Sequence, residues 1–482
     1  MPPIATSPLV PEPHGLPRYA LPGWSGLAGV ARSDITAPVG IRMRNWGYGD
    51  ADISTGVHSP LTLTALAMAP ASGDAAAAPH EISLIITADL GWWRTTEDEQ
   101  QVRRAILAAT GLTDARLLLH LTHTHAGPSI CREDVDLPGG ELVPEYLDAL
   151  AAAAARAAVA AIDDLGPADL VWASGMHGLA AVRDVSLEGQ ALLGFDPAQE
   201  PDQTLVVGRL TAPNGAVRAT VVNYACHPTT LGYANSQLST DFVGPMRDVV
   251  ESYTAAPCLF LQGASGELGP REQYSDDLGL ADRHGASLGH AAIGVLLTMP
   301  APGRALVLDD VIQSGAPLAI WSATPTLSDR TVSTEMREVP VLLKELPSIA
   351  ELELEWATID PRSRAERVRR AERLRRTYTD MDKPVHPLWV WRFGGAVFVA
   401  HPGEAYSALQ STLRRRFPGV AVIVMNLTNG PGWVYLPTED SYRANRYQAW
   451  QTIVAAGSLE HLIEAAESAI INLGLERDEV AS

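Results

Sequence analysis

The strongest constraint on the fold is a pair of continuous apolar runs, residues 82–89 and 115–122, separated by one helix-length segment. Runs without polar alternation are typical of strands that are covered on both faces. Between the runs, Thr96 and Glu99 have the spacing of a capping box, and Gly111 stands where a helix commonly ends. These residues predict a strand–helix–strand unit, which places the chain in the α/β class.

Other segments predict antiparallel pairs of strands. Asn214 and Gly215 separate the runs 204–210 and 216–225, and a Gly-Gly pair separates the runs 388–393 and 396–400. An Asn-Gly pair between two apolar runs is a strong hairpin signal. Together with the strand–helix–strand unit, these hairpins predict a mixed central sheet flanked by helices.

The sequence suggests a short arm followed by one domain. Residues 1–30 are rich in proline and small side chains, so we expect an extended arm there and a single domain over residues 31–482. Within that domain, residues from about 340 to 380 form a charged helical insertion, in which an acidic stretch precedes an arginine-rich helix. Such a helix could dock on a membrane or a partner, but its acidic neighbour can neutralise it. We expect a solvated helical hairpin.

Composition excludes several classes of function. The net charge of -20 argues against nucleic acid and anionic membranes as partners, because both attract clustered lysine and arginine. The three cysteines have no CxxC spacing, which argues against disulfides and against cysteine-ligated zinc. No signal-peptide pattern is present, and no apolar run reaches the roughly 18 residues of a membrane helix. We expect a cytoplasmic protein without stable membrane anchoring, and homo-oligomer formation is left open.

Three histidines and one carboxylate follow predicted strands. His123 and His125 end the run 115–122, His227 follows the run 216–225, and Glu404 follows the run 396–400. Alternate residues of a strand face the same way, so His123 and His125 are expected on one side. They could share a metal, or one could bind it while the other contacts the substrate. Histidines plus a carboxylate, with a position left for water, are what a catalytic zinc site requires. A structural histidine, and a carboxylate at a helix N-terminus, are the alternatives.

The order of short motifs resembles the neutral and alkaline ceramidase family and its shorter bacterial relatives. The motifs run from Asp34 to Tyr447 and are SDITAPVG, GYG, TADLG, LTHTHAGP, NYACHPTTLG, STDFVG, QGASGELGP, HPGE and GWVYLPTEDSYRANRY. Because the chain ends soon after Tyr447, we expect the C-terminal β-sandwich domain of true ceramidases to be absent. The resemblance implies a ceramidase-like catalytic domain with its metal site at strand ends.

The resemblance also implies roles for individual residues. It places one Zn²⁺ per chain on His123, His227, Glu404 and Tyr435. His125 would then lie beside the metal, and Arg183 and Tyr447 would donate hydrogen bonds to the oxyanion that forms when an acyl carbon is attacked. The alternatives are a surface salt bridge for Arg183 and core packing for Tyr447.

The departures from the family bear on mechanism and substrate. Gly269 stands where the family carries a serine, so metal-activated water is favoured over a serine nucleophile. The expected loss of the second domain favours a small acylated substrate. We therefore expect a zinc-dependent hydrolase that cleaves the amide bond of a small soluble N-acyl compound. A zinc esterase or lactonase, a true ceramide hydrolase, and a non-catalytic metal-binding scaffold are the alternatives in that order.

Overall fold

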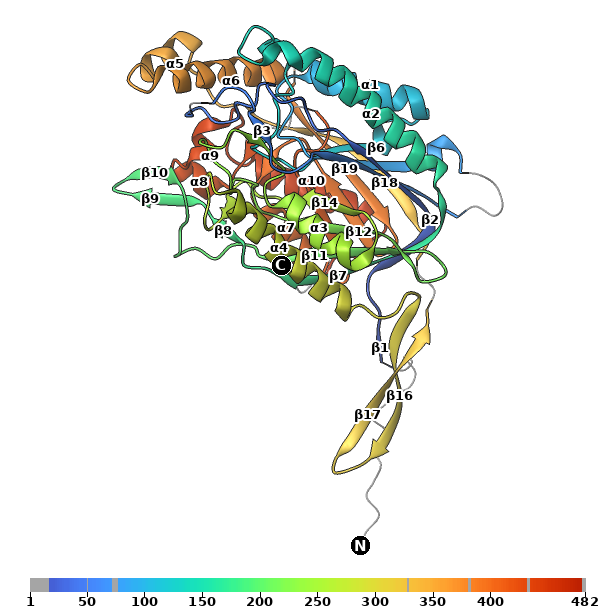
Figure 1. Ribbon diagram of the computed structural model, residues 1–482. Helices are drawn as coiled ribbons and strands as arrows, with labels where there is room; N and C mark the ends of the chain where they lie inside the picture. The colour runs from blue at the N-terminus through green and yellow to red at the C-terminus, as the bar shows by residue number, and fades with distance from the viewer. Residues whose placement is uncertain are drawn as a thin grey trace.

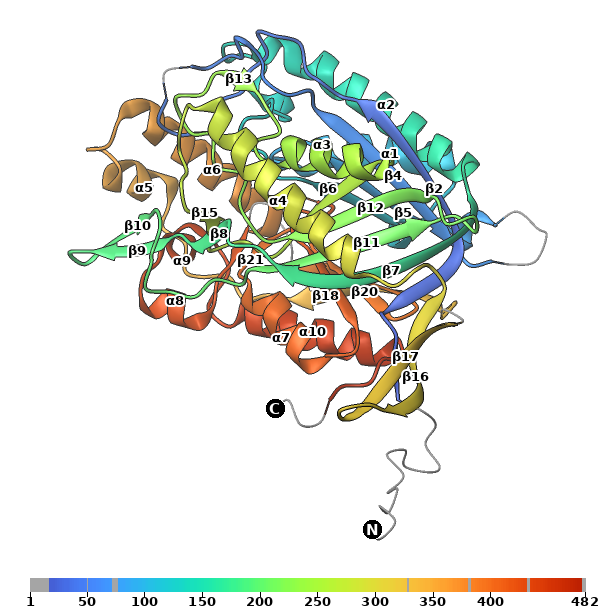
Figure 2. The same ribbon diagram turned by 60° about the horizontal axis from the view of Figure 1, so that its bottom comes forward.

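The protein consists of two mixed β-sheets packed face to face, with helices on their outer faces (Figures 1 and 2). The computed structural model describes residues 17–49, 51–71, 77–326, 329–379, 383–430 and 434–478. The predicted α/β class with a mixed sheet flanked by helices is confirmed.

The larger sheet has eight strands. Their order is β14 (Cys258–Gln262), β12 (Val217–Tyr224), β11 (Thr204–Thr211), β7 (Gly166–Met176), β2 (Gly23–Asp34), β4 (Thr62–Ala69), β5 (Ser83–Ala88) and β6 (Leu117–Leu121). The pairs β12–β14 and β5–β6 are parallel and the others are antiparallel. The strand–helix–strand unit and the hairpin at Asn214 and Gly215 are therefore confirmed.

The expected arm is wrong for residues 23–30, which belong to strand β2. This strand pairs with β7 through residues 23–28 and with β4 through residues 27–34, so it joins the two halves of the sheet. Trp24 and Ala28 are fully buried on one face of β2. Small residues between them hid a period-two pattern that marks a strand. Residues 1–16 of the expected arm lie outside the described part of the chain.

The smaller sheet has four strands and supplies half of the core. Its order is β18 (Val332–Pro340), β19 (Val385–Phe393), β20 (Ala396–Ala400) and β22 (Ala421–Met425). Aromatic side chains fill the space between the two sheets: Trp24 contacts Phe393 edge-on at 5.2 Å between ring centroids, and Trp172 contacts Phe398 at 5.7 Å. Alternate residues of β20 and β22 face this layer and the outer helices, which explains their uninterrupted apolar sequences.

Helices cover the outer faces of both sheets. α1 (Thr96–Thr110) and α2 (Val143–Asp163) pack over the β4–β6 end of the large sheet, while α3 (Val243–Thr254) and α4 (Leu278–Thr298) pack over its other end. α7 (Ala408–Arg416) and α10 (Ser458–Asn472) cover the small sheet. The N-cap of α1 is Thr95, one residue before the expected Thr96. Across the described ranges, no helix combines the length and apolar character needed to span a membrane.

A ribbon projects from the body beside the sheets. Strands β16 (Arg304–Gln313) and β17 (Pro317–Pro325) form an antiparallel hairpin, and β1 (Arg18–Tyr19) pairs with β16 at its base. Figure 1 shows this ribbon extending downward from the rest of the structure.

The charged insertion forms helices α5 (Ile349–Glu355) and α6 (Pro361–Thr379), but it is not the expected solvated hairpin. α6 packs on the body through arginines that pair with acids outside the insertion. Arg373 bonds Asp134 at 2.8 Å and Glu133 at 3.0 Å, and Arg376 bonds Glu133 at 2.9 Å. Asp134 is 1% exposed. The sequence could not show this docking, because the acids lie more than 200 residues before the arginines.

Asp134 is expected to contribute strongly to the attachment of α6. Its carboxylate also accepts hydrogen bonds from Arg94 at 2.9 Å and Ser129 at 2.8 Å. Removing one partner of a buried ion pair leaves an uncompensated charge. We predict that Asp134→Asn lowers the free energy of unfolding in urea by about 3–5 kcal/mol. The exposed Asp148→Asn should change it much less.

The same carboxylate predicts a dependence of stability on pH. Burial acts to raise the pKa of Asp134, but Arg94 and Arg373 hold it at about 2, below the usual 3.8. A lowered folded-state pKa adds stability above the unfolded-state value of about 4. That stability should be lost as the pH falls from about 4 toward 2, and Asp134→Asn should lose less over this range. Parallel acid denaturation curves would contradict the prediction.

Candidate metal centre

His123 lies in the turn that follows β6, with its imidazole fixed by the backbone. Its φ is 72°, in the left-handed region, and its amide donates to the carbonyl of Leu90 at 2.9 Å. Nδ1 lies 3.1 Å from the carbonyl oxygen of Gly91. A carbonyl only accepts hydrogen bonds, so Nδ1 carries a proton, and in the neutral ring Nε2 presents its lone pair. The two histidines of the H-x-H motif do lie together, with ring centroids 4.8 Å apart, but a turn brings them together rather than strand alternation.

His227 is held in the same way after β12. Its Nδ1 lies 2.7 Å from the carbonyl oxygen of Ser265 and 3.0 Å from that of Leu268. Burial and the neighbouring Arg183 lower the pKa of His227 to about 3. The imidazole is therefore neutral, and its Nε2 lone pair, which accepts a hydrogen bond from Arg183 at 3.1 Å, could instead bind a metal ion.

Glu404 brings a carboxylate to both imidazoles. It begins β21 (Glu404–Ala405), and its Oε2 lies 3.0 Å from Nε2 of His227 and 3.2 Å from Nε2 of His123. Burial acts to raise the pKa of Glu404, but positive charge or a donated proton at the two imidazoles lowers it well below its usual value. Two lone pairs and an anionic oxygen repel one another unless a cation or a proton lies between them. The donor set therefore fits a divalent metal ion.

Tyr435 lies beside this group. It begins β23 (Tyr435–Leu436), which pairs with β21 so that Tyr435 is directly opposite Glu404. Burial and the charge of Glu404 raise the pKa of Tyr435 well above its usual value. The structure thus places all four predicted ligands together, although it does not test which of them bind metal.

His125 is the third imidazole of the cluster. Ring nitrogens of His123, His125 and His227 lie within 4.8 Å of one another, an arrangement that could hold a metal ion. Both ring nitrogens of His125 are buried and have no hydrogen-bond partner among the described residues. Its ring packs between Trp46 and Trp92, at 5.1 and 4.9 Å between centroids. His125 can therefore ligate a metal or face a substrate.

Arg183 is part of the centre and not a surface residue. It follows β8 (Ala180–Val182), is 3% exposed, and its Nη2 lies 2.8 Å from the carbonyl oxygen of Gly266, 3.1 Å from Nε2 of His227 and 3.2 Å from the hydroxyl of Tyr435. Burial acts to lower its pKa, but Tyr435 and other neighbouring acidic groups raise it above the usual value. A permanently charged donor therefore lies beside the candidate ligands.

Tyr447 lies next to Tyr435, on the side of the cavity where α6 is found. It begins α9 (Tyr447–Gln451), its ring centroid is 6.0 Å from that of Tyr435, and its hydroxyl accepts a hydrogen bond from Arg370 at 3.0 Å. Because this bond uses the oxygen as acceptor, the hydroxyl proton is free to be donated. Sequence reasoning missed Arg370, since its place depends on how α6 docks.

These groups lie at one end of a cavity of about 710 Å³. A volume of this size suits a small-molecule ligand. The cavity reaches from His123 and Glu404 to the inner faces of α5 and α6, and Trp46, Trp92, Trp356 and Trp450 line it. The charged insertion is therefore a wall of the candidate site.

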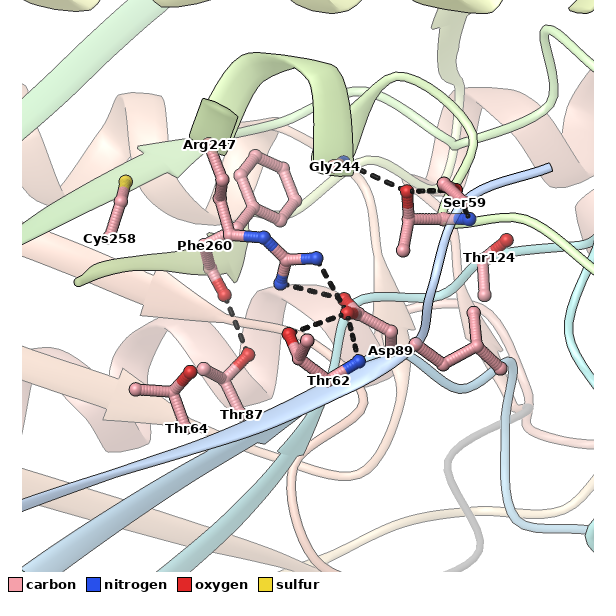
Figure 3. A network of polar contacts seen from close by, with 12 residues as sticks. Ser59, Thr62, Thr64, Thr87, Asp89, Thr124, Gly244, Arg247, Cys258 and Phe260 are labelled. Atoms are coloured by element: carbon pink, nitrogen blue, oxygen red, sulfur yellow. Dashed lines mark hydrogen bonds and ion pairs between the residues drawn. The ribbon is translucent and has the colours of Figure 1, made fainter. Parts of the chain in front are cut away.

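An ion pair behind the centre fixes the turn that holds His123 (Figure 3). Asp89 follows β5 and receives two hydrogen bonds from Arg247 of α3, at 2.9 and 2.6 Å. It also accepts bonds from the amide and hydroxyl of Thr62, at 2.8 and 3.0 Å. The next two residues supply the carbonyls that bond to His123. Asp89 thus supports the position of a candidate ligand without contacting it.

Comparison with solved structures defines the fold. The chain has a mixed α/β architecture, and a group of histidines that could hold a metal ion lies at its strand ends. It is similar to the neutral ceramidase from Pseudomonas aeruginosa, with a TM-score of 0.63 and 15% identity over 95% of this chain and 76% of that one. A second similar structure, a ceramidase complexed with C2, has a TM-score of 0.63 and 14% identity, again over 95% of this chain and 76% of that one. No family model and no curated protein matches the sequence. The neutral ceramidase fold expected from the motifs is confirmed.

Arg247 is expected to support both stability and metal binding. Arg247→Leu leaves the carboxylate of Asp89 buried without its partner, so we predict a loss of about 3–5 kcal/mol in the free energy of unfolding. The affinity for Zn²⁺, measured against a competing chelator, should fall by about 10–100-fold. The exposed Arg283→Leu on α4 is the matched control. Unchanged zinc affinity in a folded Arg247→Leu protein would contradict the proposed support.

Proposed function

We propose that this protein is a zinc-dependent amidohydrolase that acts on a small acylated compound. The observation that carries the proposal is the meeting of Glu404 with the unprotonated Nε2 atoms of His123 and His227 at the end of a cavity. One Zn²⁺ per chain would be held by these three groups, and Tyr435 or His125 would complete the set. The ceramidase fold supports a hydrolase reaction.

When bound, zinc would supply Lewis acidity toward the acyl group and a water molecule of lowered pKa. The protein's own contribution begins with the position of the acyl oxygen. The guanidinium of Arg183 and the free hydroxyl proton of Tyr447 can donate to that oxygen as its negative charge develops. Trp46 and Trp92, which contact His125, help to exclude bulk water from the reacting bond.

His125 suits the transfer of a proton. Amide hydrolysis forms a C–O bond and breaks a C–N bond, and one proton of the water must reach the departing nitrogen. The ring nitrogens of His125 make no other hydrogen bond, so the imidazole can accept that proton and pass it to the amine. Burial lowers the pKa of His125 well below its usual value, which keeps the ring neutral before the reaction.

Metal content and hydrolysis together test the proposal. We expect about one zinc per chain by elemental analysis, and hydrolysis of N-acyl substrates in a panel of amides, esters, lactones and ceramide. His227→Ala and Glu404→Gln should lose zinc and lower kcat/KM by more than about 100-fold. Replacing a residue that only orients a metal ligand already lowers activity by up to about 100-fold, and loss of the ligand itself should cost more. His461→Ala replaces an exposed histidine and should match the wild type.

Each other result has a distinct meaning. Cleavage of esters or lactones alone would assign the same centre to an esterase, and cleavage of ceramide alone would assign it to a lipid amidase. Zinc binding without turnover of any substrate would indicate a metal-binding scaffold. A wild-type protein that takes up no zinc after reconstitution would overturn the proposal.

A further inference from the structure

The cavity contains a cation that the proposed chemistry does not use. Arg370 is half-buried on α6, and its one hydrogen bond to a described residue is the bond to Tyr447. It makes no ion pair with any carboxylate in the described ranges. Its neighbour Glu366 bonds Arg369 at 2.8 Å and acts on Arg370 only through its nearby charge. Burying a guanidinium without a carboxylate in contact with it is unfavourable, so this position suits an anion supplied by a ligand.

The surroundings of Arg370 add to its positive charge. The guanidinium of Arg367, one helical turn before it, lies 5.8 Å from the ring centroid of Trp356 and 5.2 Å from that of Trp450. The ring of Trp450 in turn stacks on Tyr447 at 5.6 Å. Lys344 lines the same part of the cavity. The acidic residues Glu345 and Glu355, which also line it, are exposed.

Arg370 is held in place by the attachment of α6. Arg373, one turn further along the helix, bonds both Asp134 and Glu133. The helix is therefore tied to the body next to the residue that faces the cavity. A guanidinium positioned in this way loses less freedom when it binds a planar acid than one on a mobile loop.

We propose that Arg370, with Arg367, binds a carboxylate of the substrate while the bond to be cleaved lies at His123, His227 and Glu404. This inference rests on the proposed amidohydrolase function and narrows its substrate to an acylated amine that carries a carboxylate, such as an N-acyl amino acid. The planar fork of a guanidinium matches a carboxylate. A single arginine without a carboxylate in contact suits a monoanion better than a phosphate dianion, because the nearby charge of Glu366 repels the dianion more strongly.

Three matched compounds test the charge requirement. N-Hexanoylglycine carries a carboxylate, N-hexanoylglycinamide is its neutral analogue, and N-hexanoyl-phosphoethanolamine carries a phosphate. For the zinc-loaded wild type we expect kcat/KM to be about 10–100-fold higher for the glycine compound than for the glycinamide. This is the size of effect that a hydrogen bond to a charged group contributes to binding. The preference should appear mainly in KM. Equal values for these two compounds would overturn the inference, and so would a preference for the phosphate.

Variants of α6 separate recognition from folding. Arg370→Met should lower kcat/KM for N-hexanoylglycine by about 10–100-fold more than kcat/KM for the glycinamide, because any loss that acts through the Tyr447 hydroxyl is common to both compounds. Arg370→Lys should retain part of the preference. Arg364→Met, on the same helix but outside the cavity lining, is the control. Equal losses on both compounds, with an unchanged melting temperature, would assign Arg370 a structural role and overturn the inference.

A binding measurement distinguishes this inference from the proposed function. N-(Hexylsulfonyl)glycine and its glycinamide lack the hydrolysable amide, and Trp356 and Trp450 provide a fluorescence signal near Arg370. We expect the acid to bind about 10–100-fold more tightly than the amide, and Arg370→Met to remove the difference. Selective binding without turnover of any N-acyl compound would retain the carboxylate pocket and reject the hydrolase. Turnover of N-acyl compounds without selective binding would retain the hydrolase and reject the carboxylate pocket.

Discussion

The contact on which this structure depends is that of the Glu404 carboxylate with the lone pairs of two imidazoles. His123 and His227 each use Nδ1 to bond backbone carbonyls, so in the neutral rings neither Nε2 carries the proton that would make the contact favourable. At 3.0 and 3.2 Å, this arrangement needs positive charge close by, which Arg183 supplies in part at 3.1 Å from Nε2 of His227 and which a metal ion could supply between the groups. The backbone around both histidines therefore supports a cation site, because it selects the tautomer that can bind one.

The rest of the fold holds these groups against their repulsion. His123 has a left-handed φ, which costs a non-glycine residue about 1 kcal/mol or more and persists only where the surroundings determine it. The surroundings here are the turn after β5, tied by Asp89 to Arg247 on α3. Glu404 is fixed separately, through the short pairing of β21 with β23 after the ends of β20 and β22. Elements of both sheets thus meet at one centre.

Sequence reasoning found the parts of this design that are encoded locally. Uninterrupted apolar runs identified β5, β6 and β20, because each of these strands is covered on both faces. The residues after those strands identified His123 and Glu404. Alternation along a strand correctly predicted that His123 and His125 lie close together, but the reason was wrong. Strand β6 ends at Leu121, and the turn after it brings the two histidines together. Residues 23–30 were misassigned because glycine and alanine hid the buried face of β2. Positions set by distant contacts could not be read from spacing.

Helix α6 shows why the substrate was harder to derive than the chemistry. Its arginines look equivalent in the sequence, yet they have different partners: Arg373 meets buried acids, Arg367 lies over two indole rings, and Arg370 faces the cavity with a phenol as its partner. The different partners of these three arginines become visible only when α6 is docked against residues 133 and 134. A likeness of 15% identity to a ceramidase structure shows the fold and says nothing of what this wall contacts. The candidate metal site lies at strand ends that the fold positions, whereas the proposed selectivity depends on how the charge of each arginine along α6 is balanced. Because a guanidinium without a carboxylate in contact disfavours a purely apolar ligand, the proposed pocket would separate acidic acyl compounds from neutral lipids.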